Sequence, residues 1–309
     1  MKNRRLPILM PCLMAVLIMV PVWSAAAPEA TGPSEGKEGS MSLTEANKKL
    51  TNPVSEVWSI SFEQNNYVVS TVSGQGDKWN SNLNFQPVMP VSLTKDWNLL
   101  TRPVLTLFDS TPYPLAAQDP VTHQPQTEIK HTTALGDLIW MEHLSPAPSI
   151  AGNWLLGIGP TFIFPTAASD ATGAGKWQVG PSAIVGYLSK RWILAGFVQT
   201  WMSFAGDSRR PDTKHMNLQP IASYFLKDGW SISYSGNILA NWKASSGNVW
   251  TVPLGIGVSK VKKFGGYPVK LTLAVQYMPI HPDEFGQKWN VQVSIAPVIP
   301  KIIKGSLFD

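Results

Sequence analysis

The stretch "GWSISYSGNILANW", Gly229 to Trp242, decides the fold class because its residue types alternate with a period of two. Apolar or small residues occupy every even position, and from Ser231 on serine or asparagine occupies the odd positions, with Leu239 as the exception among them. Successive side chains of a β-strand point to opposite faces of the sheet. The stretch therefore predicts a strand with one apolar and one polar face.

The same alternation recurs along the chain. An unambiguous polar face is also present in the stretches 80–89, 250–259, 269–277 and 289–295. Weaker versions fill the gaps, and twelve strands are predicted in all: 58–71, 79–92, 97–109, 131–143, 153–165, 176–188, 191–204, 215–226, 229–242, 248–260, 268–279 and 288–300. Each is long enough for a tilted membrane strand of about 9–11 residues, and the number is even. We predict an all-β fold, a transmembrane antiparallel up-and-down β-barrel of about 12 strands.

The N-terminus indicates export. Lys2, Arg4 and Arg5 precede an apolar stretch from Leu6 to Val22, and small residues follow, which is typical of a secretory signal peptide. The alternative is a transmembrane anchor, but the stretch is short for a span of about 20 residues and contains prolines. We predict a signal peptide at 1–26, a polar tether or lumen segment at 27–55, and an outer-membrane barrel at 56–309.

Composition after cleavage excludes several functions. The signal peptide carries away the one cysteine, Cys12, so neither a disulfide nor a thiolate metal site is expected. It leaves 22 Lys and Arg against 20 Asp and Glu, which gives no reason to expect nucleic acid as a partner. Charged residues are only 15%, against about 25% in soluble domains, while the chain has 13 tryptophans. An exported chain of this composition fits the outer membrane.

Tryptophan positions and connection lengths support the barrel. Nine tryptophans lie at or near predicted strand ends, where amphipathic rings meet lipid headgroups: Trp79, Trp97, Trp154, Trp177, Trp192, Trp230, Trp242, Trp250 and Trp289. Connections on one side are mostly tight, as at 94–96 and 189–190, whereas the other side has the long connections 110–130, 166–175 and 205–214. This asymmetry is typical of outer-membrane barrels.

Prolines are the main evidence against a regular barrel. Nine fall inside predicted strands, where each removes a donor from the hydrogen-bond ladder: Pro87, Pro90, Pro103, Pro160, Pro181, Pro220, Pro253, Pro297 and Pro300. We expect a kinked wall with prolines at bulges or rims.

Seven segments carry a family resemblance. They are "NPVSEVWSISFEQN" (52–65), "QPVMPVSLTKDWNLLTRP" (86–103), "LGDL" (135–138), "GIGPTFIFPTA" (157–167), "GKWQVGPSA" (175–183), "SFAGD" (203–207) and "VPLGIGVSKV" (252–261). Together and in this order, the chain resembles the outer-membrane transporters associated with the meta-cleavage pathway of phenol degradation. The resemblance implies a barrel that passes small, often aromatic or apolar, compounds, and it supplies no functional residues. The ending "GSLFD" departs from many barrels, because Phe308 is penultimate.

Motifs for catalysis are weak. Gly173-Ala-Gly175-Lys176 resembles the end of a phosphate-binding loop, but the required upstream glycine and the following Ser or Thr are missing. We interpret 167–175 as a surface hairpin loop, with Gly173 and Gly175 adopting turn conformations. The histidines show no zinc spacing and are expected at the solvated surface: His123, His131, His143, His215 and His281. A barrel phospholipase would need a Ser, His and Asn cluster, which no strand contains.

Charges inside the predicted strands are the candidate functional residues. A basic residue facing lipid at mid-membrane costs about 2–4 kcal/mol, so these side chains are expected to face the lumen. The candidate lumen lining comprises Glu63, Asn82, Asn84, Gln86, Arg102, Asp137, Lys270, Gln276 and Gln292.

The sequence as a whole predicts a monomeric outer-membrane channel. It would pass small apolar or aromatic molecules passively, with outer-membrane lipid and the permeant as partners and with no catalytic residue, cofactor or metal. The polar segment around Asn52, Pro53 and Val54 is expected to enter the lumen as a constriction. An exported soluble β-sandwich that binds a ligand remains an alternative, as does a barrel hydrolase.

Overall fold

The computed structural model describes residues 41–72, 75–118 and 124–308, so the predicted signal peptide lies outside the described residues. In this part of the chain the helices are α1 (Leu43–Thr51), α2 (Pro148–Ala151) and the 3-10 turn η1 (Lys227–Gly229). The strands are β1 (Ser59–Val69), β2 (Lys78–Ser92), β3 (Trp97–Gln118), β4 (Pro125–Leu135), β5 (Leu138–Pro146), β6 (Trp154–Phe164), β7 (Lys176–Leu188), β8 (Trp192–Gly206), β9 (Lys214–Phe225), β10 (Trp230–Tyr234), β11 (Ile238–Asn241), β12 (Trp250–Phe264), β13 (Tyr267–Ile280) and β14 (Gln287–Pro297). No described helix is long and apolar enough to cross a membrane.

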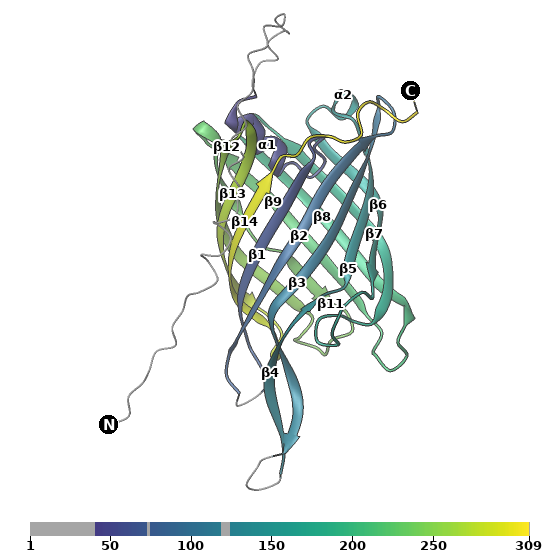
Figure 1. Cartoon of the computed structure of the whole chain (residues 1–309), viewed down its shortest axis with the longest axis vertical. Helices are drawn as coiled ribbons and strands as arrows, with labels where there is room; N and C mark the ends of the chain where they lie inside the picture. The colour runs from purple at the N-terminus through teal and green to yellow at the C-terminus, as the bar shows by residue number, and fades with distance from the viewer. Residues whose placement is uncertain (1–40, 73–74, 119–123, 309) are drawn as a thin grey trace, which may run out of the picture. The chain divides into compact units, whose positions relative to one another are not determined.

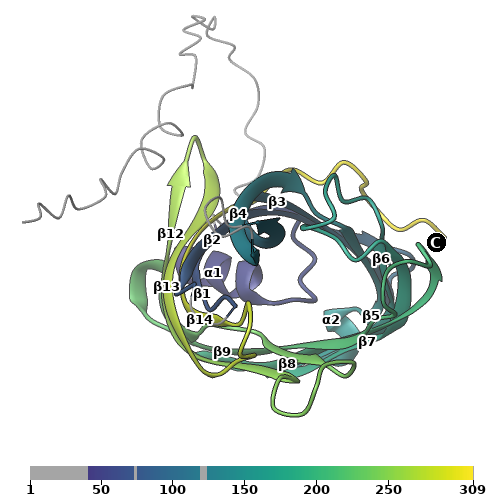
Figure 2. The ribbon, with the colours of Figure 1, turned by 90° about the horizontal axis from the view of Figure 1, so that it is seen from below.

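The strands form one antiparallel sheet that closes on itself (Figures 1 and 2). Each pairs with its neighbour in the chain, and β14 returns to pair with β1, with Gln64 opposite Val293. β4 and β5 are one wall strand with a break at Gly136 and Asp137, and β10 and β11 are another. Counted this way, the described residues give twelve wall strands, which confirms the predicted barrel. The β-sandwich alternative is wrong, because the described strands form one closed sheet and not two packed sheets.

The stretch that predicted the fold is itself interrupted. β10 and β11 are separated at 235–237, and Gly236 has a φ of 135°, a backbone conformation that an L side chain rarely adopts. A Cβ on Gly236 would also lie 2.4 Å from the Pro253 ring. The predicted single strand 229–242 is therefore wrong in its middle, because glycine here permits a kink that period-two alternation does not reveal.

The outer surface of the barrel is apolar. Outward side chains of β12 such as Leu254 and Ile256 are more than 60% exposed, and outward residues of β13 and β14 continue this surface. All nine tryptophans predicted at strand ends are exposed, between 37% and 54%. Exposed rings at both ends of an apolar band match the two headgroup regions of a bilayer. Such a surface is stable only in contact with lipid, since water would face a very large apolar patch.

Prolines coincide with gaps in the ladder. Pro160 lies opposite Pro181, so two neighbouring strands lose donors at one point. The β2–β3 pairing stops after Phe85 and resumes at Met89, and Pro87 lies in this gap. The wall is irregular at these positions, as the prolines predicted.

The loop from 165 to 175 connects β6 to β7, as expected for a surface hairpin. Gly175 has a φ of 66°. The interpretation of Gly173 as a turn glycine is wrong, because its φ is not positive. Its constraint is space: a Cβ would lie 2.2 Å from the Cβ of Ala167 and 2.6 Å from Oδ1 of Asp137.

The N-terminal described segment enters the barrel (Figure 2). Ser42 caps α1, since its Oγ accepts the Glu45 N–H at 3.2 Å. Asn47, which is fully buried, donates to the Gly229 carbonyl and to Oγ of Ser231, both at 3.0 Å. These bonds fix α1 at the end of the barrel that carries the short turns, which is the periplasmic end in barrels of this type.

Candidate permeation pathway

An inner cavity of about 360 Å³ lies between the N-terminal segment and the barrel wall. Residues 49–53 form one side of it, and inward residues of β1, β2, β3, β9, β10, β13 and β14 form the other. The entry of Asn52 and Pro53 into the lumen agrees with the position that the sequence predicted. Their effect on permeation is taken up below.

Seven of the nine candidate residues line this cavity: Glu63, Asn84, Gln86, Arg102, Lys270, Gln276 and Gln292. Asn82 is buried beside it and accepts a hydrogen bond from Asn65 at 3.2 Å. Asp137 lies elsewhere. It occupies the break between β4 and β5, and its carboxylate accepts the N–H groups of Ala167 at 3.1 Å and Ala174 at 2.8 Å. The prediction that Asp137 lies within a strand is wrong: its side chain fastens the β6–β7 loop instead.

An amide network runs across the cavity side of the wall. Asn65 is at its centre: its Nδ2 donates to Glu63 at 3.1 Å, and its Oδ1 accepts from Asn290 at 2.9 Å and Gln292 at 3.0 Å. The network extends through Asn82, Asn84, Gln276 and Ser235. Buried polar groups without partners are costly, so this closed set of bonds fixes the amide orientations.

Arg102 lies beside the proline gap in β2 and β3. Its Nη2 donates to Oε1 of Gln86 at 2.5 Å, across the unpaired part of the two strands. Its guanidinium carbon lies 5.7 Å from the centre of the Phe197 ring, a cation–π distance. The buried Nε of Arg102 has no hydrogen-bond partner among the described residues.

Lys270 faces the N-terminal segment. Its Nζ donates to Oγ1 of Thr51, the last residue of α1, at 2.6 Å. An ammonium group carries three N–H donors, and this bond uses one of them. The contact joins the wall to the segment that closes the cavity.

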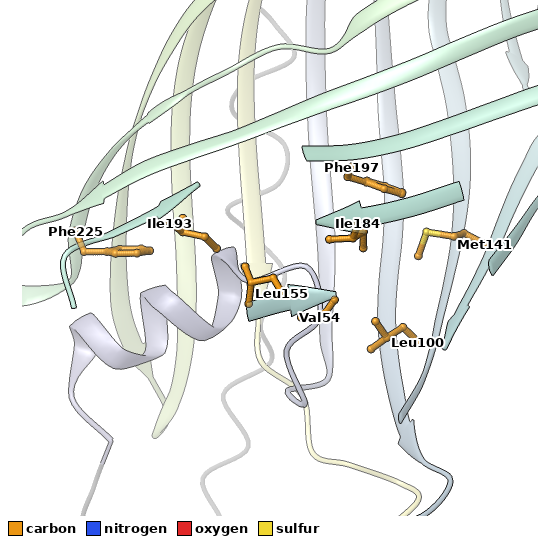
Figure 3. Packing of buried hydrophobic residues seen from close by; sticks show 8 residues of the cluster. All are labelled: Val54, Leu100, Met141, Leu155, Ile184, Ile193, Phe197 and Phe225. Carbon is orange, nitrogen blue, oxygen red and sulfur yellow. The ribbon is translucent and has the colours of Figure 1, made fainter. Parts of the chain in front are cut away.

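An apolar cluster fills the lumen near the short-turn end (Figure 3). Val54 from the N-terminal segment packs there against inward residues of β3 and of β5 to β9. The other members of the cluster are Leu100, Met141, Leu155, Ile184, Ile193, Phe197 and Phe225. The N-terminal segment is therefore held by apolar packing as well as by the hydrogen bonds of α1.

An outer cavity of about 860 Å³ opens toward the long-loop end. Its apolar and aromatic lining includes Ile139, Ile163, Trp201 and Met216. The Trp201 ring lies 5.3 Å from the ring of His215. Leu239 lines both cavities, so they are adjacent in the barrel. Leu239, the apolar exception in the alternation of the stretch 229–242, is thus an inward residue between the two cavities.

The surface placement expected for the histidines is wrong for His143. This ring is fully buried, its Nε2 hydrogen-bonds Oγ of Ser182, and its edge meets Phe197. Nδ1 of His143 has no partner among the described residues, so no third group orients the ring as in a catalytic triad. His123 lies outside the described residues. Within the described ranges, no three His, Cys, Asp or Glu side chains gather as metal ligands would.

Ion pairs join the loops at the outer mouth. Arg210 donates to the carbonyls of Asp170 at 3.1 Å and Gly173 at 2.5 Å, which ties the β8–β9 loop to the β6–β7 loop. Hydrogen bonds from Arg209 lower the pKa of Asp207 from 3.8 to about 2. The bond from Lys176 at 3.1 Å likewise lowers the pKa of Asp212.

Sequence reasoning missed Asn65 and Leu239 as functional positions, and it did not predict the apolar packing of Val54. Asn65 lies in "EQNN", where both faces of β1 are polar, so alternation does not mark the inward side chains. Val54 was named only as part of a polar segment. Its packing against strands from across the barrel has no local signal.

No family model and no curated protein sequence matches the chain. Among solved structures, the barrel is similar to an outer-membrane channel from Pseudomonas putida F1, with 13% identity and a TM-score of 0.53 over 79% of this chain and 96% of that one. This likeness supports the fold. Two others score below 0.5, too low to support an argument: the NanC porin (7% identity, TM-score 0.42, 79% and 99% covered) and the CymD monoaromatic hydrocarbon channel (11%, 0.40, 88% and 94%).

Proposed function

We propose that this protein is a passive channel of the outer membrane for small apolar or aromatic molecules. The observation that carries the proposal is a pair of adjacent cavities inside a lipid-facing barrel, the outer one lined by apolar and aromatic side chains such as Ile163 and Trp201 together with polar ones such as Asn217. A molecule entering at the long loops would contact Trp201 and Met216 first and then pass Leu239 into the inner cavity. Movement along this path makes and breaks no covalent bond. The chain acts as a monomer.

The N-terminal segment is the constriction in this proposal. Residues 49–53 form the wall of the inner cavity on the periplasmic side, and Val54 lies in the apolar cluster. A permeant reaches the periplasm when this segment shifts. The seven lining residues predicted from the sequence would contact the permeant during passage, and export through a cleaved signal peptide would bring the chain to the membrane.

The resemblance to transporters of the phenol meta-cleavage pathway supports aromatic permeants in particular. The seven sequence segments span nearly the whole mature chain in order. Phenol-like compounds combine an apolar ring with one polar group, which suits a path that has both kinds of lining.

Uptake into proteoliposomes tests the proposal. The purified protein should accelerate the entry of radiolabelled toluene, while liposomes with heat-denatured protein should not. Deletion of residues 28–55 should increase both toluene entry and single-channel conductance, because it removes the constriction. A gel-mobility shift on boiling verifies that each variant is a folded barrel. Equal toluene entry with folded and denatured protein would contradict the proposed function.

A further inference from the structure

The inner cavity contains more positive charge than its surroundings balance. Three basic residues line it, Lys49, Arg102 and Lys270, against one acidic residue, Glu63. Among the described residues, no carboxylate lies within 4.0 Å of Lys270 or Arg102. Taking a charge out of water without a paired partner is expensive. An anion in the cavity would supply that partner.

The donors that remain free have the chemistry of a carboxylate site. Arg102 is partly exposed and uses Nη2 on Gln86, although its Nε is buried out of a ligand's reach, while Lys270 uses one of its three donors on Thr51. A guanidinium fork and an ammonium group are the donors that bind carboxylates most strongly in proteins. Amide side chains of Gln276 and Gln292 line the same cavity and provide neutral partners.

Apolar surface adjoins these donors. Leu100 and Met141 line the cavity next to Arg102, and Met141 is its cross-strand neighbour on β5. Both are at most 3% exposed and belong to the packed cluster, but Leu50, Val57 and Leu239 also line the cavity and are only half-buried, so an aromatic ring or short alkyl chain would cover these three. A volume of about 360 Å³ is at the lower end of the range for small-molecule sites.

We propose that the inner cavity is a binding station for small carboxylates with an apolar body, such as an aromatic acid, held by Arg102 and Lys270. This inference rests on the proposed function and narrows its substrate class. The permeant would cross the outer cavity, whose lining combines apolar residues with Asp283 and Glu284, and then pause with its carboxylate at the two cations. The N-terminal segment, which contacts Lys270 through Thr51, forms the far side of this station.

Binding of two matched ligands to the full-length protein in detergent micelles tests the station. Benzoate and benzyl alcohol have the same ring, but only benzoate carries a charge. Calorimetric titration should show benzoate binding at least about 10-fold tighter than benzyl alcohol, because only benzoate accepts charge-assisted hydrogen bonds from Arg102 and Lys270 with a full negative charge. Arg102→Gln and Lys270→Gln should each weaken benzoate at least about 10-fold and leave benzyl alcohol unchanged.

Lys263→Gln is the matched control, since Lys263 is exposed near the end of β12 and the same charge is lost outside the cavity. It should leave benzoate binding unchanged. Equal binding of both ligands by the unaltered protein, or the same loss in Lys263→Gln, would overturn the station. Should Arg102→Gln fail to fold in the gel-shift assay, benzoate binding is measured with Arg102→Lys and Lys270→Gln instead. Unchanged benzoate binding in both of these variants would overturn the station. Toluene entry without benzoate preference defeats only the station, whereas absence of both toluene and benzoate entry defeats the channel.

Discussion

The barrel interior has two sides that differ in packing. Inward side chains of β5 to β8 fit against one another so closely that Thr161, Ile184 and Phe197 are at most 3% exposed. Inward side chains of β1, β2, β13 and β14 instead border the inner cavity. Hydrogen bonds between side-chain amides, rather than close packing, hold them in place. We call these the packed side and the cavity side. The difference agrees with the proposed pathway, which runs along the cavity side.

The two sides also differ in how clearly the sequence shows them. Stretches with an unambiguous polar face became β2, β10 and β11, β12, β13 and β14, which are mostly on the cavity side. Strands of the packed side gave weaker alternation because apolar or small residues face inward as well as outward, as Ile184 and Val185 do. Where apolar side chains fill the lumen, both faces of a strand are apolar, and the alternation of polar and apolar residues no longer identifies the strand.

The largest expected effect comes from a charge on the packed side. Ile184→Asp places a carboxylate at a position that is 1% exposed, so we expect a loss of about 3–5 kcal/mol or failure to fold. Urea unfolding in micelles, followed by tryptophan fluorescence, measures it. The matched change on the cavity side, Ala296→Asp, should cost less than about 1 kcal/mol, because this half-buried position borders the inner cavity and lies opposite Lys270. Equal costs would remove the distinction between the sides.

Asn65→Leu should destabilise the barrel by about 2–3 kcal/mol. It removes the centre of the amide network and leaves groups of Glu63, Asn290 and Gln292 without that partner. Asn82→Ala removes one bond at the edge of the network and should cost about 1 kcal/mol by the same unfolding assay. A network whose members act independently would instead give similar losses for both variants.

Asn47→Ala should cost about 1–2 kcal/mol and raise channel conductance. The change removes both hydrogen bonds that fix α1 to Gly229 and Ser231, while the wall remains intact. Single-channel recording measures the conductance, with Glu45→Gln on the exposed face of α1 and outside the cavity lining as the control. Unchanged conductance in a folded Asn47→Ala barrel would show that α1 does not restrict the pathway.

The smallest effect is expected at the loop above the packed side. Because the pKa of Asp207 is lowered to about 2 in the folded chain, its contribution to stability is present above about pH 4 and is lost as pH falls through 2. Carboxyl NMR chemical shifts should give a titration midpoint near 2 for Asp207, and Arg209→Ala should return it toward 3.8. A midpoint near 3.8 in the unaltered protein would mean that the pair with Arg209 does not form in solution.

Local sequence predicted most of the barrel but less of the pathway. Period-two alternation identified all twelve wall strands and the outward tryptophans, because each depends on neighbouring residues facing lipid or lumen. It placed Asp137 in a strand and His143 at the surface, and both are wrong. Asp137 is held by amides some 30 to 37 residues away, and His143 by Ser182 on another strand. Contacts of this kind leave no periodic trace.

The sequence by itself determined that this chain makes a barrel with a lipid-facing exterior and polar inward residues. It could do so because lipid requires an apolar outward face on every strand, and the alternation of residue types within each strand meets this requirement locally. Only the tertiary structure decided which inward residues surround a cavity and which pack together, and that Val54 packs into the apolar cluster inside the barrel. Those outcomes depend on closure of the sheet, which brings side chains from distant strands into contact.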